Sequence, residues 1–413
     1  GLLKSFQARD DVFFDCWTHL LAQTGFDELD QILFGDITQD KYNIFEYVKA
    51  GNFYRQLNDH SPFIDLNSLN KEDHQQGVKE ILNITEIKEE FQNLEEQLLA
   101  TFGKYITENV FAPVMRKLLK TELADLVPNA HLYFGLKRVL ALTPEESREL
   151  KNIPIHDERL GFHSFKEGVS SIKSFYPHER GVGAWIERLK MELEKANVEV
   201  LLNNSVTEIK SESGEIQQVI LEDSRQLECD FLIWTIPSFM LIKAAKINLE
   251  RKLSPPKKLV SCLYHFIVDK PYKTDLHFAH CYDERLKAFR MTFYRNANGQ
   301  VEKGYPLTVE VLAEEGVDPE KEEDVFNELK EMKVIEADSK YTFSKSDFIK
   351  GGFPIPTHQF KKDSMYQNEL VSNQFDNLRL LGKASGKSFF MSDVLRETFD
   401  CISKLSEVSE IHG

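Results

Sequence analysis

A strand, a glycine turn and the start of a helix follow one another near the C-terminus, and this succession restricts the possible folds most. Residues 378–381 form an apolar run of strand length, residues 382–386 a turn, and residues 392–405 have helical spacing. A glycine at a strand end lets the phosphate or ribityl chain of a ligand approach the backbone. The free N–H groups of a helix start suit an electron-rich ring oxygen. An ordinary turn with Ser392 as N-cap explains the same residues, and both interpretations stay open here.

Strand and helix patterns also alternate in the middle of the chain. An amphipathic helix is predicted at 183–196, and residues 21–150 are expected to be mostly helical. Short β-prone runs predict strands at 12–14, 198–202, 206–209, 216–221 and 229–234. Further β-prone runs at 259–268, 288–294 and 307–312 predict a second sheet, followed by an acidic helix at 319–332. The α/β segments on both sides of other material indicate a discontinuous domain with insertions.

Length and charge restrict the class of protein. A chain of 413 residues is too long for one compact core, so two domains are expected. The net charge of -16 would repel a phosphate backbone, which argues against nucleic-acid binding. Five scattered cysteines without a CxxC pair suggest neither a zinc ribbon nor a disulfide framework, so reduced thiols in a cytoplasmic protein are expected. No apolar run reaches the roughly 20 residues of a membrane span, and no signal peptide opens the chain.

Two glycines that open the predicted helix at 183–196 need a separate interpretation. Gly181 and Gly183 form a GxG without a third glycine and without a preceding strand. As a dinucleotide fingerprint this pattern is rejected. A loop that leads into a helix and then into two strands explains it instead.

Several of these segments together resemble a known superfamily. Residues 175–183, 206–209 and 230–237 are similar to the middle of flavin amine oxidases, protoporphyrinogen oxidases and UDP-galactopyranose mutases, and residues 377–393 are similar to their closing segment. The front of the chain resembles the stretch after the superfamily's first βαβ unit. The resemblance implies a two-domain FAD-dependent oxidoreductase with an N-terminally truncated nucleotide-binding domain, because the GxGxxG and the acidic residue that follows it are absent.

The resemblance also assigns cofactor contacts to individual residues. Gly1, Leu2 and Ser5 would lie near the pyrophosphate and ribityl of FAD, and Val206 would meet the adenine through its backbone. Thr235 and Pro237 would line the nucleotide cleft, and Gly382 and Lys383 would contact the pyrophosphate–ribityl region. The flavin ring would meet Met391, Ser392 and Asp393. His19 would lie beside the ring as the candidate catalytic residue, tuning flavin protonation or acting as acid or base near pH 7.

Other candidate residues have more ordinary explanations. His277, His280 and Cys281 lack a second ligand pair, so no metal site is expected. Arg290 and Arg295 fall on predicted strands of the second sheet, where an arginine could clamp a carboxylate or phosphate, but ordinary surface arginines are favoured.

The fold class predicted is therefore α/β, with a discontinuous Rossmann-like FAD domain at 1–20, 165–245 and 351–413 and an inserted α+β substrate domain at 21–164 and 246–350. The predicted function is FAD-dependent oxidation of a small organic substrate, although the truncated chain by itself is expected to be inactive. One alternative is a reduced-flavin nucleotide-sugar mutase, which would need arginines converging opposite His19. Another is a non-catalytic descendant of the flavoprotein fold, for which Trp17, Lys383 and the missing fingerprint would argue.

Overall fold

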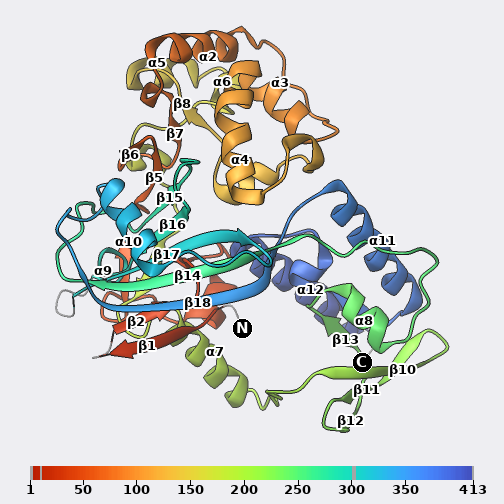
Figure 1. Ribbon diagram of the computed structural model, residues 1–413. Helices are drawn as coiled ribbons and strands as arrows, with labels where there is room; N and C mark the ends of the chain where they lie inside the picture. The colour runs from red at the N-terminus through yellow and green to blue at the C-terminus, as the bar shows by residue number, and fades with distance from the viewer. Residues whose placement is uncertain (1–2, 10–11, 300–303, 412–413) are drawn as a thin grey trace. The chain divides into compact units, whose positions relative to one another are not determined.

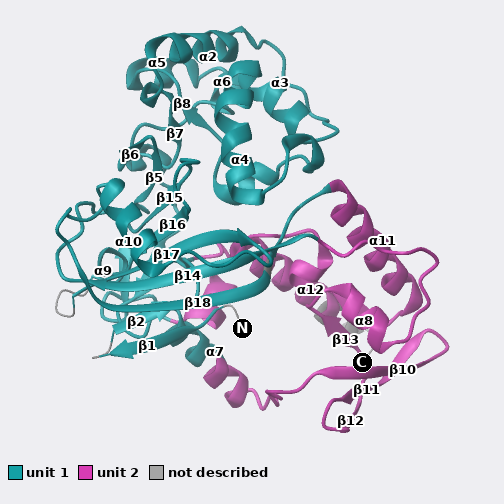
Figure 2. Ribbon diagram, viewed as in Figure 1, with its two compact units in different colours: residues 1–22, 36–189, 257–357 teal, residues 23–35, 190–256, 358–413 magenta. Residues whose placement is uncertain are grey.

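The computed structural model describes residues 3–9, 12–299 and 304–411, and the chain divides into two compact units (Figures 1 and 2). Unit 1 comprises residues 1–22, 36–189 and 257–357, and unit 2 comprises residues 23–35, 190–256 and 358–413. The predicted domain boundaries differ from those of the two units, for residues 1–22 belong to unit 1 together with 36–189 and 257–357. Which unit binds a cofactor is a separate question, and the assignment of an FAD domain stays a prediction.

A seven-stranded sheet forms the centre of unit 1 (Figure 1). Its strands, in spatial order, are β18 (Tyr341–Pro354), β14 (Lys258–Val268), β17 (Tyr305–Glu314), β16 (Ala288–Phe293), β15 (Phe278–Cys281), β5 (Ala50–Tyr54) and β6 (Gln56–Asn58). One face is apolar and packs against α10 (Glu322–Glu331), which contributes Val325, Phe326 and Leu329 to the shared core. These three residues have the i, i+1, i+4 spacing of a helix that buries one side.

The opposite face of this sheet, which we call the polar face, carries side chains in register across several strands. Glu310 of β17 lies opposite Arg290 of β16, and Thr308 lies opposite Thr292. His265 of β14 pairs with Thr308 on the other side of β17. Because side chains alternate along a strand, these residues point to the face opposite the apolar core.

Three small sheets complete the β-structure of unit 1. They are the hairpin of β1 (Ser5–Arg9) and β2 (Val12–Asp15), the sheet of β3 (Leu21–Ala22), β9 (Ser174–Pro177) and β4 (Tyr42–Phe45), and the pair β7 (Ile64–Asp65) and β8 (Val139–Leu140). Phe14 of the hairpin is fully buried and shares a core cluster with Ile267 and Tyr294. The hairpin is thereby anchored to the seven-stranded sheet.

A helical part of unit 1 lies at one end of the sheet (Figure 1). It contains α2 (Lys71–Asn83), α3 (Leu94–Ile106), a π-helical turn (Thr107–Phe111), α4 (Ala112–Leu119), α5 (Pro144–Leu150) and α6 (Pro154–Asp157). The asparagine side chains of Asn70 and Asn93 cap the first two helices, and Thr143 with Glu146 forms a capping box for α5. Its core is built mainly by apolar residues of α3 and α4.

Unit 2 contains a parallel strand pair and the helices beside it. β13 (Leu232–Trp234) pairs with β19 (Leu378–Leu380), and β10 (Val206–Glu212), β11 (Glu215–Leu221) and β12 (Gln226–Glu228) form a meander. The helices are α1 (Asp27–Phe34), α8 (Ser238–Ala244), α11 (His358–Gln374) and α12 (Met391–Ile411), and α7 (Gly183–Lys195) contains the boundary at residue 189. Trp234, Leu241 and Val371 belong to the core that joins the strand pair to its helices.

Most of the predicted elements are confirmed, and three expectations are wrong. The GxG of Gly181 and Gly183 was expected to lack a preceding strand, but β9 ends at Pro177, shortly before it. Residues 198–202 form no strand, and their apolar side chains Val198, Val200 and Leu202 are exposed. An apolar run becomes a strand when a neighbouring strand pairs with it, and the described residues provide none there. The expectation that residues 21–150 are mostly helical is wrong in part, because they also contain β3 to β8. Among the described residues, no helix is long and apolar enough to cross a membrane.

Candidate active site

A buried carboxylate, Asp15, organises the start of unit 1. Its Oδ1 accepts hydrogen bonds from the Ser5 hydroxyl (2.5 Å) and the Val182 N–H (3.0 Å), and its Oδ2 accepts one from the Tyr176 hydroxyl (2.5 Å). The Gly183 N–H donates in turn to Ser5 Oγ (2.8 Å). The N-terminal N–H groups of α7 are thus satisfied by the chain's own side chains. This arrangement explains the GxG loop without a dinucleotide.

The first glycine of this loop, Gly181, is required by the carboxylate beneath it. Gly181 has a φ of +59°, and a Cβ there would lie 2.3 Å from Asp15 Oδ1. Burial raises the pKa of the Asp15 carboxyl to about 6, because the hydrogen bonds from Ser5 and Tyr176 only partly offset the desolvation. Burial also raises the pKa of Tyr176 well above its usual value, so its hydroxyl keeps its proton.

The loop that follows Asp15 is fixed to the polar face of the sheet. The Thr18 N–H donates to Glu310 Oε1 (3.0 Å), and the Thr18 hydroxyl contacts both Glu310 and Thr292. Glu310 is 1% exposed and receives two parallel hydrogen bonds from Arg290, at 2.8 and 2.9 Å. A bidentate pair of this kind holds both side chains in one orientation. Residues 16–20 therefore have a defined position over strands β16 and β17.

A second hydrogen-bonded chain connects the same loop to the middle of the sheet. The Asp15 N–H donates to Tyr294 Oη (3.1 Å), Tyr294 Oη bonds Thr308 Oγ1 (3.0 Å), and Thr308 Oγ1 bonds His265 Nδ1 (2.8 Å). Burial lowers the pKa of His265 to about 3, while the charge of Asp347 raises it only in part. His265 is thus a neutral imidazole at ordinary pH, and its function in the sheet is structural.

His19, the predicted catalytic residue, lies next to Thr18 on this loop. Its side chain is half-buried, and its backbone follows the segment that Glu310 holds. Ser5, which was predicted near the cofactor, uses its hydroxyl for Asp15 and Gly183. Gly1 and Leu2 lie outside the described residues. These roles toward a cofactor stay predictions.

The remaining predicted cofactor residues lie in unit 2, around one edge of the parallel strand pair. Residue Thr235 directly follows β13, and Gly382 follows β19, so both lie at the carboxyl ends of parallel strands. Ligands of open α/β sheets bind at this edge. Pro237 and Lys383 are exposed beside them, Met391, Ser392 and Asp393 form the first turn of α12, and Val206 begins β10.

This edge has features that fit a flavin nucleotide. Gly382 has a φ of +62°, and a Cβ there would meet nothing closer than Val394 at 3.7 Å. Backbone conformation, and not crowding within the unit, therefore selects glycine at this position. Large apolar side chains are exposed nearby, namely Ile236, Phe239, Met240 and Phe390. Exposed apolar groups beside polar strand ends are typical of a site for an aromatic ligand.

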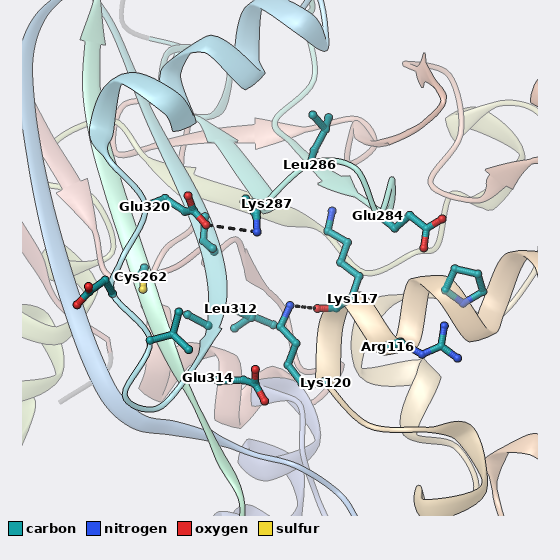
Figure 3. Close-up of a pocket in the computed structure, with 15 residues that line it drawn as sticks. Arg116, Lys117, Lys120, Cys262, Glu284, Leu286, Lys287, Leu312, Glu314 and Glu320 are labelled. Carbon is teal, nitrogen blue, oxygen red and sulfur yellow. Dashed lines mark hydrogen bonds and ion pairs between the residues drawn. The ribbon is translucent and has the colours of Figure 1, made fainter.

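A separate cavity of about 350 Å³ opens in unit 1 beside the C-terminal end of α4 (Figure 3). Its wall includes Cys262 and Val311, which belong to the apolar core and not to the polar face. The cavity is lined by four basic and four acidic residues. The basic residues are Arg116, Lys117, Lys120 and Lys287, and the acidic residues are Glu284, Glu314, Asp318 and Glu320. Equal numbers of opposite charges, with Lys287 paired to Glu320 at 3.4 Å, favour no charged ligand. The polar face therefore remains the better candidate for the active site.

Lys117 at this cavity has a structural task. Its Nζ donates to the carbonyl oxygens of Cys281, Asp283 and Ala288 at 2.7 to 2.8 Å. Burial lowers the pKa of the Lys117 ammonium, and the nearby Cys281 opposes that shift. Three carbonyl acceptors match the three donors of an ammonium group, so Lys117 closes the turn between β15 and β16.

Sequence reasoning missed the partners that give these residues their positions. Arg290 is not an ordinary surface arginine, since its side chain is 22% exposed and bound to the buried Glu310. Glu310 follows Val309 in an apolar strand, and a carboxylate inside such a run is the signal that could have indicated a buried pair. Neither His277 nor His280 belongs to a metal cluster of the described residues. His277 stacks on Phe45, and His280 stacks on Tyr282.

The fold is shared with several solved structures. Reduced UDP-galactopyranose mutase is 14% identical with a TM-score of 0.70, over 93% of this chain and 82% of that chain. A putative protoporphyrinogen oxidase from Exiguobacterium sp. 255-15 is 14% identical with a TM-score of 0.60, over 92% and 84%. A CLA-producing fatty acid isomerase from P. acnes is 13% identical with a TM-score of 0.57, over 98% and 89%. At such identities the likeness shows the two-domain α/β fold alone.

A search of curated proteins gives no significant match. A comparison with protein families is decisive instead, because the model of the flavin containing amine oxidoreductases matches residues 14–263, more than half of the chain. The matched region includes Asp15, Tyr176, Thr18, His19 and β13. The chain belongs to the family of flavin-containing amine oxidoreductases.

Proposed function

We propose that this protein binds FAD and oxidises a small organic substrate held over the polar face of the seven-stranded sheet. The observation that carries the proposal is the fixed position of the loop with Thr18 and His19 over Glu310 and Arg290. When bound, FAD supplies the electron-transfer chemistry, while the protein supplies binding, orientation and electrostatics. Family membership supports the cofactor, and the positions of Thr235 and Gly382 at the carboxyl ends of the parallel strands support its place.

Each residue of the polar face has a distinct task under this proposal. Glu310 fixes the guanidinium of Arg290 through Nε and one terminal nitrogen, which leaves the other terminal nitrogen outside that pair. That nitrogen could orient an anionic group of a substrate. His19 would accept or donate the proton that accompanies oxidation, since imidazole changes charge near neutral pH. Thr18 holds His19 in place through its N–H bond to Glu310.

A nucleotide-sugar mutase is the second candidate. Arg290 favours it, because a cation held close to the Thr18–His19 loop could meet the diphosphate of a sugar nucleotide. Among the described residues, Arg290 is the one arginine that pairs with Glu310, whereas several converging arginines were expected for a mutase. The oxidoreductase therefore remains the first candidate.

The first experiment is the visible absorption spectrum of the protein purified from its complete reading frame. Flavin bands that stay with the protein through gel filtration are expected. The oxidised protein is then given a panel of amines while hydrogen peroxide is measured, and the dithionite-reduced protein is given UDP-galactopyranose. Turnover of amines supports the oxidase, and isomerisation of the sugar nucleotide supports the mutase. A well-folded, colourless protein that ignores added FAD would refute both.

Two glycine variants test the strand edge as the cofactor site. Gly382 and Gly386 have φ angles of +62° and +72°, and a Cβ at either position would have its nearest contact at 3.7 Å. Gly382→Ala and Gly386→Ala therefore carry about the same backbone strain, roughly 1 kcal/mol. Flavin content should fall in the first variant and stay near the parent value in the second. Equal flavin content in both would remove the strand end from the site.

His19 is tested by replacement with asparagine, which keeps a polar side chain but cannot titrate. His60→Asn is the control, because His60 is exposed and lies outside the polar face. The expected result is a loss of turnover of about a hundredfold for His19→Asn, with unchanged flavin content. Unchanged turnover would remove His19 from the mechanism and leave the cofactor assignment intact.

A further inference from the structure

A hollow of about 430 Å³ on unit 2 collects positive charge in a strongly acidic protein. It is lined by Arg251, His358, Lys361, Lys362, Met365, Tyr366 and Glu369. All but Arg251 come from α11, at positions spaced three or four residues apart, so they share one side of the helix. The whole chain has a net charge of -16. We infer that this hollow binds a phosphate group, carried by a small phosphate ester or as the free ion.

The arginine of the hollow is held in place before any ligand arrives. Arg251 forms an ion pair of 2.8 Å with Asp363, which is 4% exposed, and donates to the Lys362 carbonyl (3.3 Å). Its guanidinium lies 4.4 Å from the centre of the Tyr366 ring. Burial raises the pKa of Asp363, but hydrogen bonds, chiefly that from Gln359, outweigh it and hold the pKa below its usual value. Asp363 therefore stays ionised and fixes the guanidinium over the ring.

The two lysines provide the mobile part of the site. Within the described residues, the Nζ atoms of Lys361 and Lys362 form no hydrogen bond and no ion pair, and both side chains are exposed. Two adjacent ammonium groups beside an arginine repel one another unless an anion lies between them. The single acid on the wall, Glu369, is seven residues beyond Lys362, about 10 Å along the helix axis. Arg251 is compensated by Asp363, whereas the charges of Lys361 and Lys362 have no ion-pair partner among the described residues.

The chemistry of the wall indicates the class of ligand. An oriented guanidinium and two flexible ammonium groups match the several oxygens of a phosphate, which accepts hydrogen bonds in different directions. Met365 is 52% exposed beside them and offers an apolar contact to an organic substituent. The hollow thus favours a phosphate monoester over inorganic phosphate. A failure of this phosphate-site proposal can be distinguished from a failure of the proposed function, because the hollow lies outside the predicted cofactor edge.

The test is calorimetric titration of the FAD-saturated full-length protein with phenyl phosphate, inorganic phosphate and sodium acetate. Saturation with FAD removes binding at the cofactor's own phosphate sites. Phenyl phosphate should bind more tightly than inorganic phosphate, and acetate should bind least. In the Lys361→Gln/Lys362→Gln variant, affinity for phenyl phosphate should fall by about tenfold or more, as expected for the loss of two cations.

The control is Lys190→Gln/Lys243→Gln, which removes the same charge from exposed positions of unit 2 outside the hollow. Its affinity should stay within about twofold of the parent. Equal weakening in both variants would show a general charge effect and overturn the site. Unchanged binding in the Lys361/Lys362 variant, or no binding to the parent, would overturn it too. Equal affinity for both phosphates would overturn the role of Met365 and assign the hollow to the free ion.

Discussion

Replacement of Asp15 by asparagine should change how the stability of unit 1 depends on pH. The folded carboxyl has a pKa of about 6, against an unperturbed value of 3.8. Between these values the folded protein holds a proton that the unfolded chain has lost. Stability therefore decreases as pH rises through this window, and the contribution present at low pH is lost above pH 6. The difference between the two pKa values corresponds to about 3 kcal/mol.

The asparagine side chain has the same shape and cannot titrate. Its amide oxygen can accept the hydrogen bonds from Ser5 and Val182, but its NH2 group, which cannot accept, then faces the Tyr176 hydroxyl. At pH 4.5 the variant should be less stable than the parent. Between pH 4.5 and 7.5 the free energy of unfolding of Asp15→Asn should rise relative to the parent by about 2 kcal/mol, the part of the full effect in that interval.

The assay is urea unfolding followed by circular dichroism at several pH values, analysed as the difference between variant and parent. The difference is needed because six of the described histidines act in the opposite direction, their pKa values being lowered by burial: His131, His156, His163, His265, His277 and His280. Their stabilising effect is lost as pH falls below 6.5. Asp125→Asn, at an exposed position, is the control and should show no pH-dependent difference. A flat difference for Asp15→Asn, or one of opposite sign, would refute the reasoning.

Further predictions concern buried polar groups and one glycine. Lys117→Met should lower the free energy of unfolding by about 3 kcal/mol or more, because three carbonyls lose their donor. In the same urea unfolding assay, the exposed control Lys137→Met should stay within about 0.5 kcal/mol of the parent. Gly181→Ala should lower the melting temperature more than Gly316→Ala does, because both glycines have a positive φ but only the first variant places a Cβ against Asp15. Equal decreases in melting temperature would contradict this. Glu310→Ala should lower the free energy of unfolding, measured in urea, by about 3–5 kcal/mol, and the additional change Arg290→Ala should recover part of this loss. If the effects of the two changes simply add in the double variant, the pair is not coupled.

Much of the local structure could be predicted from the sequence alone. Periodicity located β14, β16 and β17, the amphipathic helix α7, and the strand–glycine–helix unit around Gly382, because these patterns depend on neighbours along the chain. The family resemblance rested on residues 175–183, 206–209, 230–237 and 377–393, and the family match confirmed the family. Residues 198–202 show the limit of local pattern, because strand formation there needed a pairing partner.

The contacts that build the candidate site were decided by the tertiary structure. Asp15 and Tyr176 are 161 positions apart, and Thr18 and Glu310 are 292 apart, so no local pattern could pair them. Arg290 illustrates the consequence, since its sequence suggests a surface charge and its cross-strand partner makes it part of a buried pair. The GxG loop is similar: its glycines are visible in the sequence, but only the folded chain shows that they close over Asp15. Local spacing in the sequence determined most of the helices and strands, whereas strand pairing, charge pairing and burial depend on which distant segments meet.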